Sequence, residues 1–232
     1  MSKVRRILEH QPAHLAWLLA LLLGMLGASR LPGFSQGEFL GVSTRTWVLL
    51  SVANAVIHQV FVWICWRTEL YSQLLTRVLG KAAFASYAVV FAILILARPV
   101  FVTALAISNA DTLPVDPTLA GVLGVVLVAP AAWLLYSVRR YFGFERAFGI
   151  DHFDSSCRSL PRVREGIFRF TPNAMYVFGF LVLWIPGLLL RSTAAIAVAL
   201  FSHLYIWVHY SCTEKPDMQQ IYGPNEGGVD AI

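Results

Sequence analysis

The sequence predicts an all-α polytopic membrane protein with about six transmembrane helices, and three observations support this prediction. The 232 residues are 57% apolar and 13% charged, whereas soluble globular domains are about 45–50% apolar and about 25% charged. The mean hydropathy is +0.65. Several apolar runs also approach the length of about 20 residues that a membrane-crossing helix needs. A chain this short cannot bury so much apolar surface in an interior of its own, so lipid must be the solvent for much of it.

The first four apolar runs form the predicted N-terminal transmembrane region, residues 1–138. The run at residues 14–28 is short and is closed by Arg30. It shows no obvious small-residue cleavage site, so we expect an anchor and not a removable leader. The other three runs are long enough to cross a bilayer and lie at residues 47–66, 82–107 and 119–138.

Two of these runs contain a polar residue that lipid disfavours. His58 lies inside the second run, and we expect it to be a hydrogen-bond partner between helices. Arg98 is followed by Pro99 and interrupts the third run toward its outer end. Its long side chain is expected to reach the membrane interface.

The last two apolar runs, residues 174–190 and 193–212, are separated only by Arg191 and Ser192. So short a connection predicts an antiparallel helical hairpin. This C-terminal hairpin and the segment before it form the second predicted region, residues 139–223. The rest of the chain, residues 224–232, is expected to be a flexible tail.

The basic residues are distributed unevenly between the loops on the two sides of the predicted spans. One side carries Lys3, Arg5, Arg6, Arg67, Arg77, Lys81, Arg139, Arg140, Arg146, Arg158, Arg162, Arg164 and Arg169. The opposite side carries only Arg30, Arg45 and Arg191, and its loop after the third span is acidic. Basic loops face the cytosol, so both termini are predicted there, in a bacterial inner membrane or the endoplasmic reticulum. The net charge of +5 is explained in this way without a nucleic-acid partner.

The segment at residues 139–171 is the longest predicted cytosolic connection, and it is basic and rich in aromatic residues. One interpretation is an interfacial segment that attracts anionic headgroups through its arginines. The other is a lid over a site that opens toward the cytosol. The residues that flank the hairpin favour the lid.

Polar residues mark both cytosolic ends of the predicted hairpin. Asn173 and Tyr176 lie one turn apart at the start of the fifth span, Tyr210 lies at the end of the sixth, and Glu214 follows it. Because the two spans are hairpin partners, these ends are expected to meet. A helix C-terminus disfavours an anion, so a functional role for Glu214 is expected.

The same residues carry a family resemblance. Residues 173–176 read Asn-Ala-Met-Tyr, residues 214–216 read Glu-Lys-Pro, and residues 221–222 read Ile-Tyr. This pattern resembles the integral-membrane methyltransferases, a group that includes the isoprenylcysteine carboxyl methyltransferases and the phospholipid methyltransferases. It is closest to the phosphatidylethanolamine N-methyltransferases, in which the first two blocks read Asn-Pro-Met-Tyr and Glu-Glu-Pro. Ala174 and Lys215 depart from that pattern.

The resemblance implies that S-adenosyl-L-methionine binds between the hairpin and the preceding cytosolic segment, and that a membrane lipid is the substrate. The implied cofactor-binding residues are Arg169, Asn173, Met175, Tyr176, Tyr210 and Glu214. An amine acceptor must lose its proton before it attacks, so the candidate catalytic residues are Glu214, Tyr176 and His209. No metal is expected, because the three cysteines are too scattered for a zinc cluster.

Other functions stay open beside the leading one, which is methyl transfer to the amine of an ethanolamine phospholipid. The enzymatic alternative is methylation of a prenylated cysteine carboxylate or a small lipophilic thiol. A non-enzymatic transporter or assembly factor is the alternative of a different class, although transporters often carry internal repeats and this chain shows none.

Overall fold

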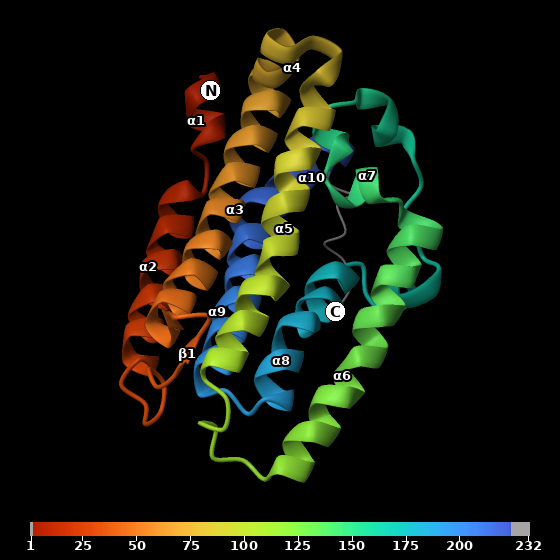
Figure 1. The fold of residues 1–232 in the computed structure, drawn as a ribbon. Helices are drawn as coiled ribbons and strands as arrows, with labels where there is room; N and C mark the ends of the chain where they lie inside the picture. Colours follow the sequence, from red (N-terminus) through yellow and green to blue (C-terminus); the bar gives the residue numbers. More distant parts are fainter. Residues whose placement is uncertain (1, 224–232) are drawn as a thin grey trace.

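The computed structural model describes residues 2–223 of the chain. It confirms the predicted fold class, an all-α polytopic membrane protein, with long helices that run side by side (Figure 1). Five helical stretches in the described residues are long and apolar enough to cross a membrane. The predicted flexible tail, residues 224–232, lies outside the described residues.

The first half of the chain forms three long helices and short connecting elements. In order these are α1 (Lys3–Ile7), α2 (Gln11–Ala28), β1 (Glu38–Phe39), β2 (Val42–Ser43), α3 (Thr44–Ser72), α4 (Leu74–Leu79), η1 (Gly80–Ala82) and α5 (Ala83–Ser108). The two strands pair as a small antiparallel hairpin. Ser43 then caps α3, because its side chain accepts a hydrogen bond from the Thr46 amide at 3.3 Å.

The second half contains α6 (Pro117–Ser137), a compact series of short helical turns, and the C-terminal hairpin. The turns are η2 (Val138–Phe142), α7 (Phe144–Ala147), η3 (Ile150–His152), η4 (Ser155–Ser159) and η5 (Gly166–Arg169). The hairpin comprises η6 (Met175–Gly179), η7 (Phe180–Leu183), α8 (Trp184–Leu189), α9 (Thr193–His209), η8 (Tyr210–Glu214) and α10 (Lys215–Tyr222).

The fifth predicted span, residues 174–190, differs from the expectation of a regular transmembrane helix. Its apolar helical part, Met175–Leu189, is shorter than the five candidate spans and changes from π to 3-10 to α geometry along its length. Pro186 lies in the first turn of α8 and has no N–H to donate to the preceding turn η7. The sixth predicted span is longer than expected, since α9 continues through η8 and α10 to Tyr222.

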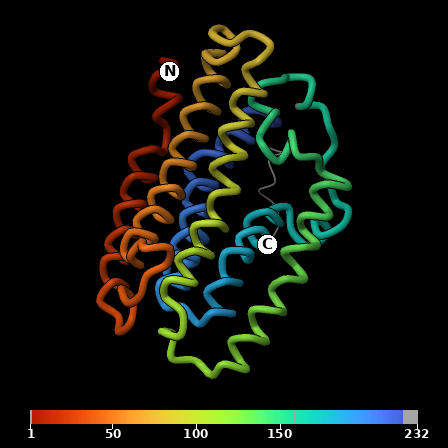
Figure 2. The backbone as a smooth tube through the Cα atoms, viewed as in Figure 1, coloured from red at the N-terminus to blue at the C-terminus, as the bar shows by residue number. Residues whose placement is uncertain are grey.

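The core is built around α9, whose small residues allow its neighbours to approach closely. Ala194, Ala195, Val198 and Ala199 have no exposed surface, and α2, α3, α5 and α8 all pack against this helix. Small residues at helix interfaces are typical of membrane bundles, because packing there depends on close backbone approach. The hairpin of α8 and α9 is thereby held in the centre of the protein (Figure 2).

Asn109 organises the end of the bundle where this hairpin turns. Its amide nitrogen donates to the carbonyls of Gly33 and Gln36 at 2.8 and 2.9 Å. Its amide oxygen accepts from the Ser192 hydroxyl and the Ala194 amide, both at 3.0 Å. Asn109 therefore ties the loop after α2 to the start of α9.

The short turns between residues 139 and 171 gather at the opposite end of the bundle. They lie at the same end as the N-terminus and α4, as Figure 1 shows. The segments whose basic residues predict one side of the membrane therefore lie at one end of the molecule. In this view α6 slants away from α5, and α8 lies between them (Figure 1).

Candidate active site

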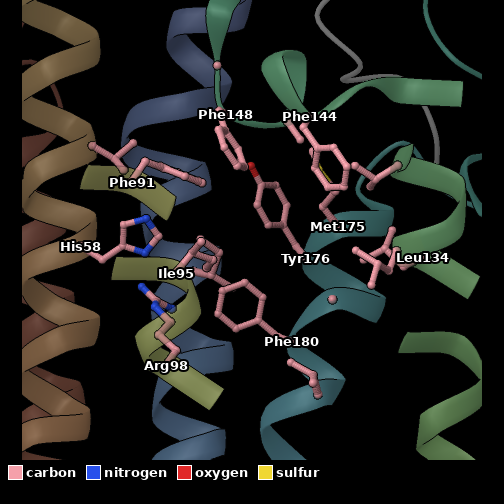
Figure 3. A pocket seen from close by; sticks show the side chains of 18 of the residues that line it. His58, Phe91, Ile95, Arg98, Leu134, Phe144, Phe148, Met175, Tyr176 and Phe180 are labelled. Carbon is pink, nitrogen blue, oxygen red and sulfur yellow. The ribbon is translucent and has the colours of Figure 1, made fainter. Parts of the chain in front are cut away.

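A cavity of about 730 Å³ lies among α3, α5, α6, the η6–α8 segment and the end of α9. Residues Gly143–Phe153, here called the cover segment, contribute much of its wall through Phe144, Phe148 and Gly149. Cavities for small ligands and cofactors typically measure about 300–1,000 Å³ and are mostly apolar. Figure 3 shows aromatic side chains from the cover segment and from η6–η7 around this space.

Tyr176 and Glu214 meet at the wall of this cavity, as the hairpin topology predicts. The Tyr176 hydroxyl donates a hydrogen bond to the Glu214 carboxylate, and both side chains line the cavity. Tyr176 lies in the π turn η6, and Glu214 ends the π turn η8. Single π turns inside helices often occur at functional sites, because they change which side chains share a face.

His209 lies at the end of α9, one π turn before Glu214, and also lines the cavity. Its ring lies 5.9 Å from the Trp66 indole and 6.0 Å from the His14 imidazole, between ring centroids. Both ring nitrogens are buried, and no hydrogen-bond partner for them occurs among residues 2–223. Unpartnered polar atoms of this kind are uncommon in folded proteins and call for a functional explanation.

The cover segment is fastened to the long helices by ring stacking and by a close polar contact. Gly149 has a φ of +85° and lies so close to Trp66 that an added Cβ would be 2.4 Å from the indole ring. His152 stacks on the same indole at 4.2 Å between ring centroids. The His152 Nε2 atom lies 3.6 Å from Asp217, which forms a buried ion pair with Arg67 at 3.0 Å. The cover segment is thus linked to both α3 and α10.

The structure places four of the seven predicted site residues on the cavity lining and three outside it. Met175, Tyr176, His209 and Glu214 belong to the lining. Tyr210 packs against the Tyr176 ring at 5.3 Å between centroids. The backbone carbonyl of Asn173 accepts the amides of Tyr176 and Val177, so this residue starts the η6 turn.

Arg169 lies away from the cavity lining. Its guanidinium stacks over Phe170 at 4.8 Å and over Trp133 at 5.5 Å. Both rings are exposed on the outer surface. This position fits contact with the membrane interface better than contact with a ligand in the cavity.

Two expectations about residues inside the spans are wrong. Arg98 does not reach the interface: it is 3% exposed, lines the cavity, and donates from Nη2 to the Ala55 carbonyl at 3.2 Å. His58 lines the cavity as well, and its ring nitrogens find no hydrogen-bond partner in the described part of the chain. An ionisable residue inside a span marks a functional site by default, and that signal was present in the sequence.

The cover segment also supplies ionisable residues that pattern reasoning did not single out. Arg146, Asp151 and His152 all line the cavity, and the Arg146 guanidinium lies 3.8 Å from the Asp151 carboxylate. In residues 2–223, no group of three or more His, Cys, Asp or Glu side chains is arranged to hold a metal ion.

Comparison with known proteins finds similarity in the second half of the chain. Residues 119–225 match the family model for phospholipid methyltransferases. The chain is similar to the phosphatidylethanolamine N-methyltransferase of Neurospora crassa, with 35% identity over 104 residues that cover 45% of this chain and 11% of the relative. The corresponding protein of Candida albicans is 26% identical over 113 residues, which cover 48% of this chain and 12% of the relative.

The chain spans only about a tenth of the length of these curated relatives. No solved structure shows significant similarity to it. The matched region contains Met175, Tyr176, His209 and Glu214, whereas His58 and Arg98 precede it. Residues 119–225 are therefore similar to the phospholipid methyltransferases.

Proposed function

We propose that this protein transfers a methyl group from S-adenosyl-L-methionine to the amine of an ethanolamine phospholipid. The observation that carries the proposal is the Tyr176–Glu214 hydrogen bond on the wall of a large, mostly apolar cavity. Both residues lie in the region that matches the phospholipid methyltransferases. The names of the similar fungal proteins support the ethanolamine phospholipid as acceptor.

The residues around the cavity fit a methyl donor that carries positive charge and a planar base. Carboxylates of Glu214 and Asp151 line the cavity, beside the aromatic rings of Phe144 and Phe148. A carboxylate pairs with the ammonium group of such a donor and offsets nearby positive charge, and aromatic faces attract cations. When bound, the donor supplies an electrophilic methyl group.

The chain then has to orient the acceptor and remove a proton from it. Alignment of the two reactants is the main requirement of an in-line displacement. The acceptor is an ammonium at neutral pH, so its proton must leave before the nitrogen attacks. Glu214 is the proposed proton acceptor, and the Tyr176 hydroxyl, which donates to it, holds the carboxylate in place. His209, buried on the same cavity, is the second candidate.

The apolar part of the cavity provides room for the lipid chains of the acceptor. Its wall includes Leu96 of α5 and Val128 of α6, two apolar residues that are 66% and 46% exposed. The basic segments lie at one end of the bundle together with the cover segment (Figure 1). This arrangement supports a cytosolic position for that end, where the methyl donor is made, and cytosolic termini.

The decisive experiment measures methyl transfer by purified protein in detergent. The protein receives methyl-labelled S-adenosylmethionine and a total lipid extract, and the organic phase is separated by chromatography. Label in phosphatidyl-monomethylethanolamine or its further methylated products, lost with Glu214→Gln and retained with Glu38→Gln, supports the proposal. Glu38 lies in the exposed strand β1, far along the chain from the cavity, and so controls for the loss of a carboxylate.

The alternatives give different outcomes in the same experiment. Label in prenylated peptide or thiol, with little effect of Glu214→Gln, indicates an acceptor that needs no base near neutral pH. A non-enzymatic protein gives no label and no stabilisation by S-adenosylhomocysteine. A ligand at a hundred times its dissociation constant otherwise adds about 2.7 kcal/mol to the free energy of unfolding.

A further inference from the structure

The deep part of the cavity contains a buried cation that the proposed chemistry does not use. Arg98 lies inside α5, ten residues before Ser108, or about 15 Å along the helix axis at 1.5 Å per residue. Figure 3 shows its guanidinium beside the His58 imidazole, next to the Phe180 ring and below Tyr176. Arg98 and His58 both belong to the cavity lining.

Most of the hydrogen-bonding capacity of this pair is unused within the chain. Arg98 donates from Nη2 to the Ala55 carbonyl, and its Nε and Nη1 atoms are buried with no partner among residues 2–223. The same holds for both nitrogens of His58. The aspartates that form ion pairs in the described part of the chain are Asp111, Asp151 and Asp217, and none of them pairs with Arg98.

A purely structural role accounts for little of this arrangement. One hydrogen bond to Ala55 and a cation–π contact with Phe180, at 5.4 Å to the ring centroid, engage a small part of a guanidinium that has five N–H donors. An unpaired charge in an apolar interior is costly, and charged residues inside spans are kept mainly where they act on a ligand.

We propose that Arg98 and His58 bind the anionic group of an amphiphile, a phosphate or carboxylate attached to an apolar chain. Arginine presents a planar fork of donors that matches such groups, and a neutral imidazole supplies one further donor. The inference deepens the proposed function, on which it rests: the methyl acceptor must carry an anion as well as the methylated group. Both residues precede the region that matches the family, so the N-terminal spans contribute to acceptor selection.

The surroundings favour an amphiphile over a small water-soluble anion. Ile95, Leu183 and Ile185 line the same cavity, and each offers only apolar contact. The anion of a free phosphate would leave these side chains uncovered, whereas an attached chain covers them and gains the associated burial energy. The carboxylate of the methyl donor is the other source of an anion, and the experiment separates it.

The test measures binding of decyl phosphate to detergent-solubilised protein by calorimetry, with decanol and inorganic phosphate as comparison ligands. We expect wild type to bind decyl phosphate more tightly than either. Removal of one member of a buried charge pair typically costs at least about 2 kcal/mol, so Arg98→Met should weaken decyl phosphate binding about thirtyfold or more. Arg77→Met, at an exposed arginine of α4, should bind like wild type.

A second readout separates a binding role from a structural one. Without ligand, Arg98→Met should unfold at the same temperature as wild type or higher, because an uncompensated buried charge has been removed. If Arg98→Met does not fold, Arg98→Lys keeps the charge without the planar fork and should bind decyl phosphate more weakly while S-adenosylhomocysteine binds normally. His58→Leu should weaken decyl phosphate binding in the same direction.

Three results would overturn the inference: equal binding of decyl phosphate and decanol by wild type, equally tight binding of inorganic phosphate alone, or unchanged binding by Arg98→Met and Arg98→Lys. Loss of S-adenosylhomocysteine binding in Arg98→Lys would instead assign the anion site to the methyl donor and also overturn it. Decyl phosphate binding requires no methyl transfer. Failure of the labelled-methyl assay therefore rejects the proposed function without rejecting the anion site. Failure of decyl phosphate binding rejects the anion site without rejecting the proposed function.

Discussion

Arg67→Met should be among the most destabilising single substitutions in the protein. The Arg67 Nε atom donates to Asp217 at 3.0 Å, with the two side chains 1% and 0% exposed. The same guanidinium donates to the carbonyls of Cys212 at 3.0 Å and Ile7 at 3.3 Å. It therefore joins three segments that lie far apart in the sequence.

The magnitude follows from the burial of the pair. Loss of one partner leaves Asp217 charged and buried, which costs about 3–5 kcal/mol in measured cases. Asp217→Leu should cost less, because Arg67 keeps its backbone carbonyl acceptors. In the double variant no uncompensated carboxylate is left, so it should be more stable than Arg67→Met alone by about 2 kcal/mol or more.

The assay is equilibrium unfolding of the detergent-solubilised single and double variants, with Arg77→Met as the control for loss of a surface arginine. A cost below about 1 kcal/mol for Arg67→Met would refute the reasoning, because that is the range of exposed ion pairs. Strict additivity of the two single variants would refute it as well, since it would mean that Arg67 and Asp217 do not interact.

Three further predictions concern the cover segment, the candidate site and the opposite end of the bundle. Gly149→Ala should speed proteolysis of residues 143–153 because its Cβ would lie 2.4 Å from an indole ring, whereas Gly121→Ala in α6, which has open space and no positive φ, should not. Tyr176→Phe should reduce methyl transfer about tenfold to a hundredfold by releasing Glu214; unchanged kcat would contradict its role. Asn109→Ala should lower the free energy of unfolding by about 2–4 kcal/mol, because buried donors and acceptors lose their partner. Asn109→Asp should not restore the lost stability in thermal unfolding, because it places a carboxylate oxygen against the Gly33 and Gln36 carbonyls.

The fold class and the meeting of Tyr176 with Glu214 follow from features that a sequence displays directly. Apolar content and run length identify membrane-crossing segments without any knowledge of packing. Two helices joined by only two residues pack antiparallel, and this brings the ends at residues 173–176 and 210–214 together. These conclusions depend on chain connectivity and not on side-chain detail.

The irregular geometry of residues 175–189 and the role of Arg98 depend on three-dimensional packing. Pro186 alone indicates a disturbance, but the succession of π and 3-10 turns depends on how η6 and η7 fit against α6 and α9. The sequence shows Arg98 as a charge inside a span, but it does not show where the side chain lies. The three-dimensional structure shows that Arg98 is buried in the wall of a cavity between α5 and α6.

The Arg67 contacts with Cys212 and Asp217 can form only late in the synthesis of the protein. A ribosome delivers α3 to the membrane well before Cys212 and Asp217 exist, since these partners lie 145 and 150 residues further along the chain. Until α10 arrives, the early spans carry an exposed cation without its carboxylate. Arg67 therefore gains its carboxylate partner only after nearly all of the described chain has been synthesised.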